Sequence, residues 1–144
     1  MSKPFSLRMD DGTHEHLLAR AERTGASASQ LVNRYVKEGL RMDEYPGVGF
    51  VTAPDGERIP VLAGRPRLKL IDVLGTWRAE GQDAAATARY FGITEDDVQA
   101  VLRYYAAYRD ELDAAIRAHL VAQNNFERVI RQRNARAARR AANA

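Results

Sequence analysis

A short alternating segment near the start of the chain constrains its fold more than any other feature. Phe5, Leu7 and Met9 alternate with Ser6 and Arg8, and a period of two is typical of a β-strand with one apolar face. Helical patterns follow directly, so no hairpin partner is expected nearby. Because a lone strand leaves its backbone N–H and C=O groups unpaired, it requires another strand. We expect the same strand of a second subunit, antiparallel about a twofold axis.

Two helices are predicted after this segment. Leu17 and Ala21 give the first helix an apolar face, and Thr24-Gly25 ends it, because glycine suits a left-handed cap. The second helix opens with a Ser-x-x-Gln capping box from Ser27 to Gln30. Its predicted buried stripe consists of Leu31, Val32, Tyr35, Val36 and Leu40.

The order of strand, helix, glycine turn and capped helix over residues 3–42 resembles the ribbon-helix-helix DNA-binding domain of the Arc/MetJ/CopG repressors. The resemblance implies a dimer whose paired strands enter the major groove of DNA. Ser6 and Arg8 would then contact bases, since an arginine can bond to guanine O6 and N7. The expected phosphate contacts are Lys3, Ser27, Ser29 and Gln30, and the expected dimer core consists of Phe5, Leu7, Met9, Leu31 and Tyr35.

Plainer interpretations of the same residues stay open. Ser6 and Arg8 also suit an exposed strand face that binds nothing. The start of the second helix would direct backbone N–H groups at a phosphate, but Ser27 and Gln30 are equally explained as an ordinary helix cap.

A β-hairpin is predicted after the Pro46-Gly47 turn. Residues 48–51 and 59–62 are β-like and flank an Ala-Pro-Asp-Gly turn at residues 53–56. We expect residues 64–67 to form a loop. A helix should follow, because Leu70, Val73, Leu74 and Trp77 recur at helical spacing before Gly81.

Two further helices should form a helix-turn-helix. Asp83 can cap the first, which ends at Gly92, and Thr94 can cap the second. The first turn of that second helix is Glu95-Asp96-Asp97, which suits the helix dipole but would repel DNA phosphates. We therefore expect this region to mediate dimerisation or toxin docking rather than to read bases.

Residues 46–116 as a whole resemble a small bacterial domain of unknown function that is common in VapB-type antitoxins, which are encoded beside a PIN-like ribonuclease. The matching segments are Pro46-Gly47-Val48, residues 59–64, Asp72-Val73-Leu74 and residues 98–105. The resemblance implies a ribonuclease toxin as the partner.

A last helix is predicted from Asp110 to the end of the chain, with a strongly basic second half. After Glu127 the only charged residues are six arginines between Arg128 and Arg140. Beyond Ile130 no apolar stripe remains, so this part is a frayed helix or is disordered until it binds. The implied toxin carries a carboxylate cluster that arginine fits bidentately, and the expected toxin contacts are Phe126, Arg128, Ile130, Arg131 and Arg133. Non-specific DNA affinity and solubility are alternatives for the arginines.

Composition and spacing argue against other classes of protein. The chain has 144 residues, a net charge of +3 and no cysteine, which excludes disulfides and thiolate metal sites. His14 and His16 are two residues apart, so they lie on different faces of a helix and do not form a metal pair. We find no catalytic signature and expect no enzyme activity, cofactor or metal. With no membrane span or signal peptide in the sequence, we expect a cytoplasmic protein.

These observations predict a mostly α fold with short β segments. Residues 1–44 would form the ribbon-helix-helix domain, residues 46–116 the hairpin and helix-turn-helix domain, and residues 117–144 a basic helix or tail. The expected function is that of a type II antitoxin, which binds its operator DNA as a homodimer or higher oligomer, represses its own operon and neutralises a PIN-like ribonuclease. The alternatives are a transcriptional regulator or plasmid-partition protein without a toxin, and an oligomerising adaptor that does not bind DNA.

Overall fold

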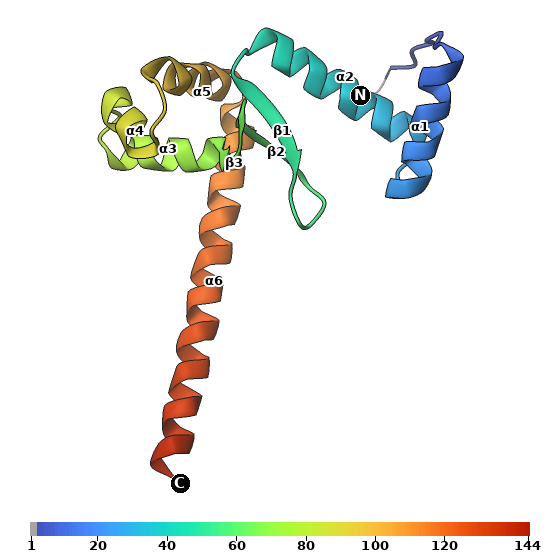
Figure 1. Cartoon of the computed structure of the whole chain (residues 1–144). Helices are drawn as coiled ribbons and strands as arrows, with labels where there is room; N and C mark the ends of the chain where they lie inside the picture. The colour runs from blue at the N-terminus through green and yellow to red at the C-terminus, as the bar shows by residue number, and fades with distance from the viewer. Residues whose placement is uncertain (1–2) are drawn as a thin grey trace. The chain divides into compact units, whose positions relative to one another are not determined.

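The computed structural model of the chain describes residues 3–144 and contains two compact units. Unit 1 is Met1–Glu44 and unit 2 is Tyr45–Ala144. The described residues form six helices and one three-stranded antiparallel sheet (Figure 1). The prediction of a mostly α fold with short β segments is therefore confirmed.

Unit 1 consists of two helices preceded by a segment without regular secondary structure, residues 3–10. The helices are α1 (Asp11–Thr24) and α2 (Ala28–Glu44). The glycine cap expected between them is present, because Gly25 has φ 71° and its N–H donates to the Ala21 carbonyl over 3.0 Å.

The capping box of α2 is confirmed in both directions. The Gln30 N–H donates to Ser27 Oγ over 3.1 Å, and the Ser27 N–H donates to Gln30 Oε1 over 3.0 Å. Helix α1 has a cap that the sequence interpretation missed. The Asp10 carboxylate accepts the backbone N–H of Thr13 at 2.9 Å and its hydroxyl at 2.8 Å, and these bonds lower the pKa of Asp10.

The buried stripe predicted for α2 is wrong for the single chain. Only Leu31 of this stripe is buried, with 2% of its surface exposed. Tyr35, Val36 and Leu40 are 44%, 53% and 55% exposed. The physical reason is that two helices cannot cover both sides of an apolar stripe without a further layer.

The sheet of unit 2 confirms the predicted hairpin and adds a strand to it. Its strands follow chain order: β1 (Val48–Thr52), β2 (Arg58–Leu62) and β3 (Arg65–Lys69). β1 and β2 pair antiparallel, with Phe50 opposite Pro60. The turn between them is closed by the Gly56 N–H, which donates to the Ala53 carbonyl over 2.8 Å.

The loop predicted at residues 64–67 is wrong, because most of it belongs to β3. Gly64 has φ 77° and allows a tight reversal after Leu62, which then pairs with Arg65. This strand contains Pro66, and proline is rare in central strands. However, β3 is an edge strand, and such a strand tolerates a proline that has no N–H to donate.

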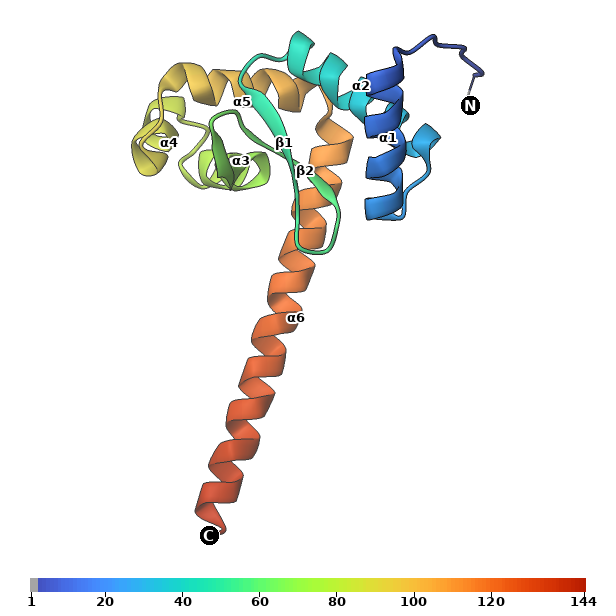
Figure 2. The ribbon, with the colours of Figure 1, turned by 45° about the vertical axis from the view of Figure 1, so that its right-hand side comes forward.

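Four helices follow the sheet: α3 (Leu70–Ala79), α4 (Ala84–Phe91), α5 (Glu95–Ala107) and α6 (Arg109–Ala142). The predicted caps are present. Asp83 Oδ1 accepts the Ala86 N–H at 3.0 Å, and Thr94 and Asp97 form a reciprocal capping box. Figure 2 shows α3, α4 and α5 gathered beside the sheet.

The core of unit 2 joins one face of the sheet to α3, α5 and the start of α6. Its members share near-complete burial: Val48, Leu62, Leu70, Val73, Leu74, Val101, Tyr104, Tyr105 and Leu112. Trp77 and Tyr108 pack against this core. These two aromatic side chains therefore extend the core. Tyr104 also meets Tyr45 edge-to-face, with ring centroids 5.6 Å apart.

Gly47 fixes the entry of the chain into this core. It has φ 100°, and a Cβ built on it would lie 2.9 Å from the Cβ of Ala100. Neither the backbone conformation nor the space admits a side chain. The Pro46-Gly47 turn is thus a close-packed joint between β1 and α5.

Helix α6 is a single 34-residue helix without a break at residue 117. At about 1.5 Å per residue it is roughly 50 Å long. Leu112 is buried and Ile116 packs against the core, but the helix then leaves the rest of unit 2 (Figure 1). Phe126 and Val129 are 67% and 56% exposed. The last predicted helix is confirmed, and the basic tail is its second half. Among the described residues, no helix combines the length and the apolar character needed to cross a membrane.

Candidate interfaces for nucleic acid and protein partners

The N-terminal segment leaves its predicted DNA-binding side chains exposed. Lys3, Ser6 and Arg8 are all exposed, and so are Phe5 and Leu7, at 87% and 60%. An intermolecular ribbon needs a second copy of the chain, so the single chain has no strand in this segment. The paired strand therefore stays a prediction.

The apolar residues of the segment and of α2 are incompletely covered within unit 1. Met9 is half-buried and lines a groove of about 340 Å³, together with Leu17 of α1 and Val32 and Tyr35 of α2. The large apolar side chains of unit 1 that remain exposed are Phe5, Leu7, Leu18, Tyr35, Val36, Leu40 and Met42. We call these seven residues the exposed apolar set of unit 1. So much exposed apolar surface on two helices and the segment before them is typical of a protein interface.

The start of α2 has the geometry expected of a phosphate contact, but two of the predicted side chains already form hydrogen bonds. The Ser27 hydroxyl and the Gln30 amide oxygen accept the two bonds of the capping box. Ser29 is exposed. The N–H groups of Ala28 and Ser29 have no backbone carbonyl to donate to within the helix, so the backbone at these two residues, rather than the capping side chains, is suited to an anion.

The acidic first turn of α5 keeps its negative charge at the surface. Glu95 and Asp96 are exposed, and Asp97 accepts the Thr94 N–H at 2.9 Å. Nearby on the edge strand, Arg65 donates to the Phe91 carbonyl over 3.3 Å, which ties β3 to the end of α4. The arrangement therefore has carboxylates where a DNA-reading helix would need neutral or basic groups.

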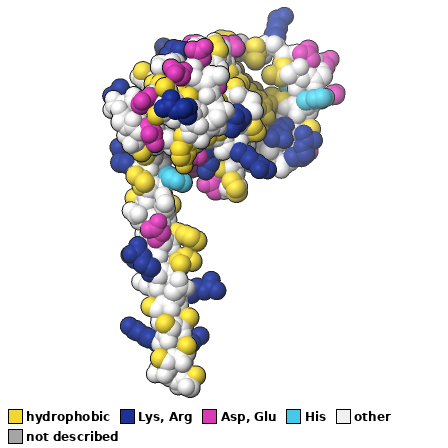
Figure 3. Space-filling view, turned by 60° about the vertical axis from the view of Figure 1, so that its left-hand side comes forward, with side chains coloured by type: hydrophobic (Ala, Val, Ile, Leu, Met, Phe, Trp, Pro, Cys, Tyr) yellow, Lys and Arg dark blue, Asp and Glu magenta, His cyan; other side chains and the backbone are white. Residues whose placement is uncertain are grey.

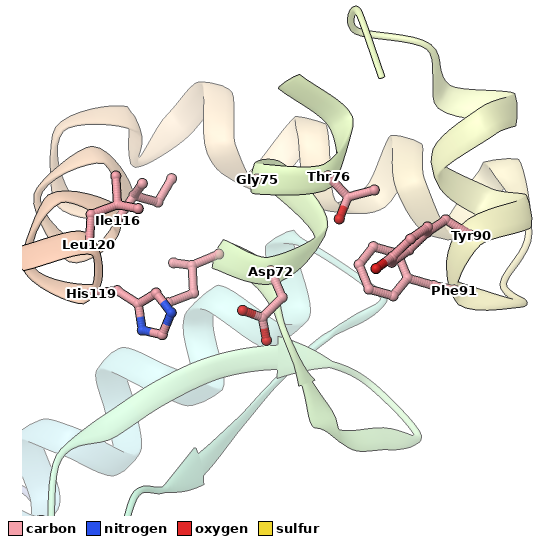
Figure 4. Close-up of a pocket in the computed structure, with 9 residues that line it drawn as sticks. Asp72, Gly75, Thr76, Tyr90, Phe91, Ile116, His119 and Leu120 are labelled. Carbon is pink, nitrogen blue, oxygen red and sulfur yellow. The ribbon is translucent and has the colours of Figure 1, made fainter. Parts of the chain in front are cut away.

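A groove of about 420 Å³ lies between α3, α4 and α6 (Figure 4). Asp72 and Thr76 come from α3, Tyr90 and Phe91 from α4, and His119 from α6; the other lining residues are Ile71, Gly75, Ile116 and Leu120. Tyr90 is 70% exposed at its edge. The groove is mainly apolar and carries a few polar groups, as protein-binding grooves commonly do.

A hydrogen-bonded cluster fastens α6 to α3 and α5. Arg78 Nη2 donates to Tyr105 Oη over 2.6 Å and to Asp113 Oδ1 over 2.7 Å, and Tyr105 Oη donates to the same carboxylate oxygen over 2.8 Å. Arg109 lies over the Tyr105 ring at 5.1 Å. The hydrogen bonds from Arg78 and then Tyr105 lower the pKa of Asp113, and the bond to Asp113 raises the pKa of Arg78.

The predicted toxin contacts lie on the outer half of α6. Phe126, Arg128, Arg131 and Arg133 are exposed and Ile130 is half-buried. Arg131 lies 3.6 Å from Glu127 in an i, i+4 pair that is itself exposed. Figure 3 shows basic side chains spaced along this part of the helix, interrupted by apolar ones.

Sequence reasoning missed three features of these sites. The Asp10 cap had a readable signal, since aspartate is a favoured N-cap and Thr13 follows three residues later. The pair of Arg78 and Asp113 gave no signal in the sequence, because the two residues are 35 positions apart and meet only in the folded chain. The groove beside His119 likewise depends on three helices packing together.

No protein-family model, curated protein or solved structure matches this chain. Over residues 3–144, no group of three or more His, Cys, Asp or Glu side chains is placed to hold a metal ion. The case for a function therefore depends on the interfaces described above and on the sequence resemblances.

Proposed function

We propose that this protein is a dimeric DNA-binding antitoxin, which pairs through unit 1, binds operator DNA with the paired segments and neutralises a PIN-like ribonuclease through α6. The observation that carries the proposal is the exposed apolar set of unit 1, next to an alternating segment that leads into two capped helices. A second copy would cover these side chains and pair the segment, so that Ser6 and Arg8 face outward together.

The expected chemistry at DNA follows from that pairing. A two-stranded ribbon fits the major groove, where the Arg8 guanidinium can form two bonds to one guanine. Lys3 and the start of α2 at Ser29 would contact the phosphates on either side. The acidic first turn of α5 would stay away from the DNA.

The toxin half of the proposal rests on the resemblance of residues 46–116 and on the exposed arginines of α6. An arginine stays charged when buried and binds carboxylates with a planar fork, which suits a metal-binding acidic site. Phe126 and Ile130 would fix the helix in an apolar groove of the toxin.

Titration of the upstream DNA tests the DNA half. Arg8→Ala should weaken specific binding by about 1–3 kcal/mol, the scale of one bidentate base contact, while the melting temperature stays the same. Lys37→Ala is the matched control, because it removes the same charge from an exposed position on α2. Equal affinity for both variants and the unaltered protein would remove Arg8 from the interface.

Deletion of residues 124–144 tests the toxin half. We expect a truncated protein that binds its operator normally but no longer protects cells that express the adjacent ribonuclease gene. If protection survives and operator affinity falls together with its salt dependence, the arginines contact DNA instead. If both activities survive, α6 does not bind the toxin.

A further inference from the structure

The apolar face of α6 continues beyond the point where the protein can cover it. Leu112 and Ile116 face the core of unit 2. The same alternating spacing of four and three residues continues through His119, Gln123, Phe126 and Ile130. In a helix this spacing keeps side chains on one face. The face that is buried at the start of α6 is therefore exposed in its second half, where Phe126 is 67% exposed.

The groove between α3, α4 and α6 lies beside the middle of this face. Ile116 and His119 line it from α6, and Ile71 and Phe91 line it from α3 and α4 (Figure 4). A groove of about 420 Å³ can accept large side chains from a helix laid along α6. The chain itself carries such side chains at Phe126 and Ile130. They cannot reach the groove of their own copy, because they lie further along the same continuous helix.

Charge determines which helix fits and in which direction. Beyond Glu127 the helix carries only arginines among its charged residues, and Arg133 and Arg140 continue the spacing of the apolar face. In a parallel pair each of these arginines would lie against the same arginine of the second copy. Two copies of α6 that run antiparallel instead place each basic half beside the groove of the other copy, where Asp72 provides a carboxylate.

We propose that α6 pairs antiparallel with α6 of a second copy, with Phe126 and Ile130 of each copy seated at the groove of the other. Gln123 lies at the centre of the pair, next to Gln123 of the second copy. In this register Ile116 meets the second copy's Ile130, and His119 meets its Phe126. From Ile116 to Ile130 the pair is about 21 Å long, at about 1.5 Å per residue.

This pairing does not depend on the proposed function, because it needs neither DNA nor a toxin. Where both occur, a toxin that binds Phe126 and Ile130 has to displace the second copy first. The free protein would then keep its toxin-binding helix covered, and a neutralising complex would form only after the pair separates.

Cysteine cross-linking of the full-length chain tests the pairing directly, because the natural sequence has no cysteine. In the Gln123→Cys protein, the cysteines of the two copies should form a disulfide under mild oxidation, since the two positions are adjacent. Ala137→Cys lies on the same face but about 42 Å from its copy in the antiparallel pair, so it should not cross-link. Asn125→Cys, on the opposite face near the centre, measures the background from random collisions.

A second substitution links the cross-link to the apolar contact. Ile130→Asp in the Gln123→Cys protein should slow cross-linking at least tenfold. Val121→Asp, an equal change on the opposite face, should leave the rate as it was; Val121 is 59% exposed. Cross-linking at Ala137→Cys as fast as at Gln123→Cys would show a parallel pair and overturn the inference. So would a Gln123→Cys rate no higher than that of Asn125→Cys, or equal slowing by Val121→Asp. DNA binding and toxin protection are absent from this assay, so its failure leaves the proposed function to its own tests.

Discussion

The sheet and the helices packed on it give unit 2 a closed apolar core within one chain, whereas unit 1 has no such core. In unit 2 the sheet, α3, α5 and α6 bury Leu70, Val73, Leu74 and Val101 completely. In unit 1, among the described residues, Leu31 alone is a buried hydrophobic residue, and seven large apolar side chains are exposed. Both units contain helices with side-chain caps, at Asp10 and Ser27 in unit 1 and at Asp83 and Thr94 in unit 2, so capping does not distinguish the units. The difference supports the proposal that unit 1 pairs with a second chain, while the core of unit 2 closes without one.

The energetic scale supports this interpretation. Covering one large apolar side chain contributes roughly 1.5–3 kcal/mol. Two copies of the exposed apolar set therefore offer enough burial to offset the cost of association, even if the dimer covers only part of each side chain.

The largest expected effect is on unit 1. Leu7→Lys would put an uncompensated charge in the shared apolar core and should unfold unit 1, because such a charge costs about 3–5 kcal/mol. Hydrogen exchange should show α1 and α2 unprotected and α3 to α6 unchanged. Ser6→Lys is the control, since the same charge on the outward face should leave protection intact. A stable Leu7→Lys unit 1 would show that Leu7 is not in a core.

A pair of truncations compares the two units directly. Leu74→Ala should destabilise unit 2 by about 2–5 kcal/mol at any protein concentration, because it leaves a cavity in a closed core. Leu40→Ala, at a side chain that is 55% exposed in the single chain, should matter only when the dimer forms. Its effect on the unfolding midpoint should therefore grow with protein concentration. An effect of Leu40→Ala that is the same at all concentrations would contradict the comparison.

Two glycines of unit 2 should respond in opposite directions. Gly47→Ala should cost about 1–3 kcal/mol, because of its positive φ and the 2.9 Å approach of its Cβ to Ala100. Gly75→Ala, in α3 with no heavy atom within 4 Å of the added Cβ, should stabilise by about 0.5–1 kcal/mol. Urea unfolding of both variants measures the change in the free energy of unfolding. If both substitutions change it in the same direction, Gly47 is not the close-packed position described above.

The smallest expected effect is the pH dependence of the Arg78–Tyr105–Asp113 cluster. Because the pKa of Asp113 is lowered in the folded protein, its stabilising contribution is present above the usual carboxyl range and is lost as pH falls through the folded pKa. Asp113→Asn should thus melt below the unaltered protein at pH 7, and the gap should close under acid conditions below about pH 4. Asp110→Asn, the same charge change on the same helix, should not show this pattern. If the difference in melting temperature persists in acid, the substitution acts by disturbing packing and not by removing the charge of Asp113.

Local signals predicted most helix boundaries, because caps depend on residues close in sequence. Thr94 and Asp97 are three residues apart, as are Ser27 and Gln30, and both capping boxes form. The edge strand β3 was not predicted. It contains Pro66, and an edge strand tolerates proline because the residue at that position need not donate an N–H to a neighbouring strand.

The burial of α2 was mispredicted for a different reason. Periodicity shows which face of a helix is apolar but not which chain covers it. Tyr35, Val36 and Leu40 have the spacing of a core stripe and are nonetheless exposed in one copy. For the candidate sites, sequence identified the basic half of α6 and the capped start of α2. It could not find the groove beside His119, whose walls come from three helices.

The claim that unit 1 is half of a dimer is tested most directly by the mass of the free protein in solution. Sedimentation equilibrium at micromolar concentration, in the Ile130→Asp protein so that α6 cannot hold two copies together, separates the outcomes. We expect twice the 16.1 kDa of one chain, and a single-chain mass when Leu7→Lys is added. A folded species of single-chain mass before Leu7→Lys is added, with α1 and α2 protected from exchange, would contradict the account.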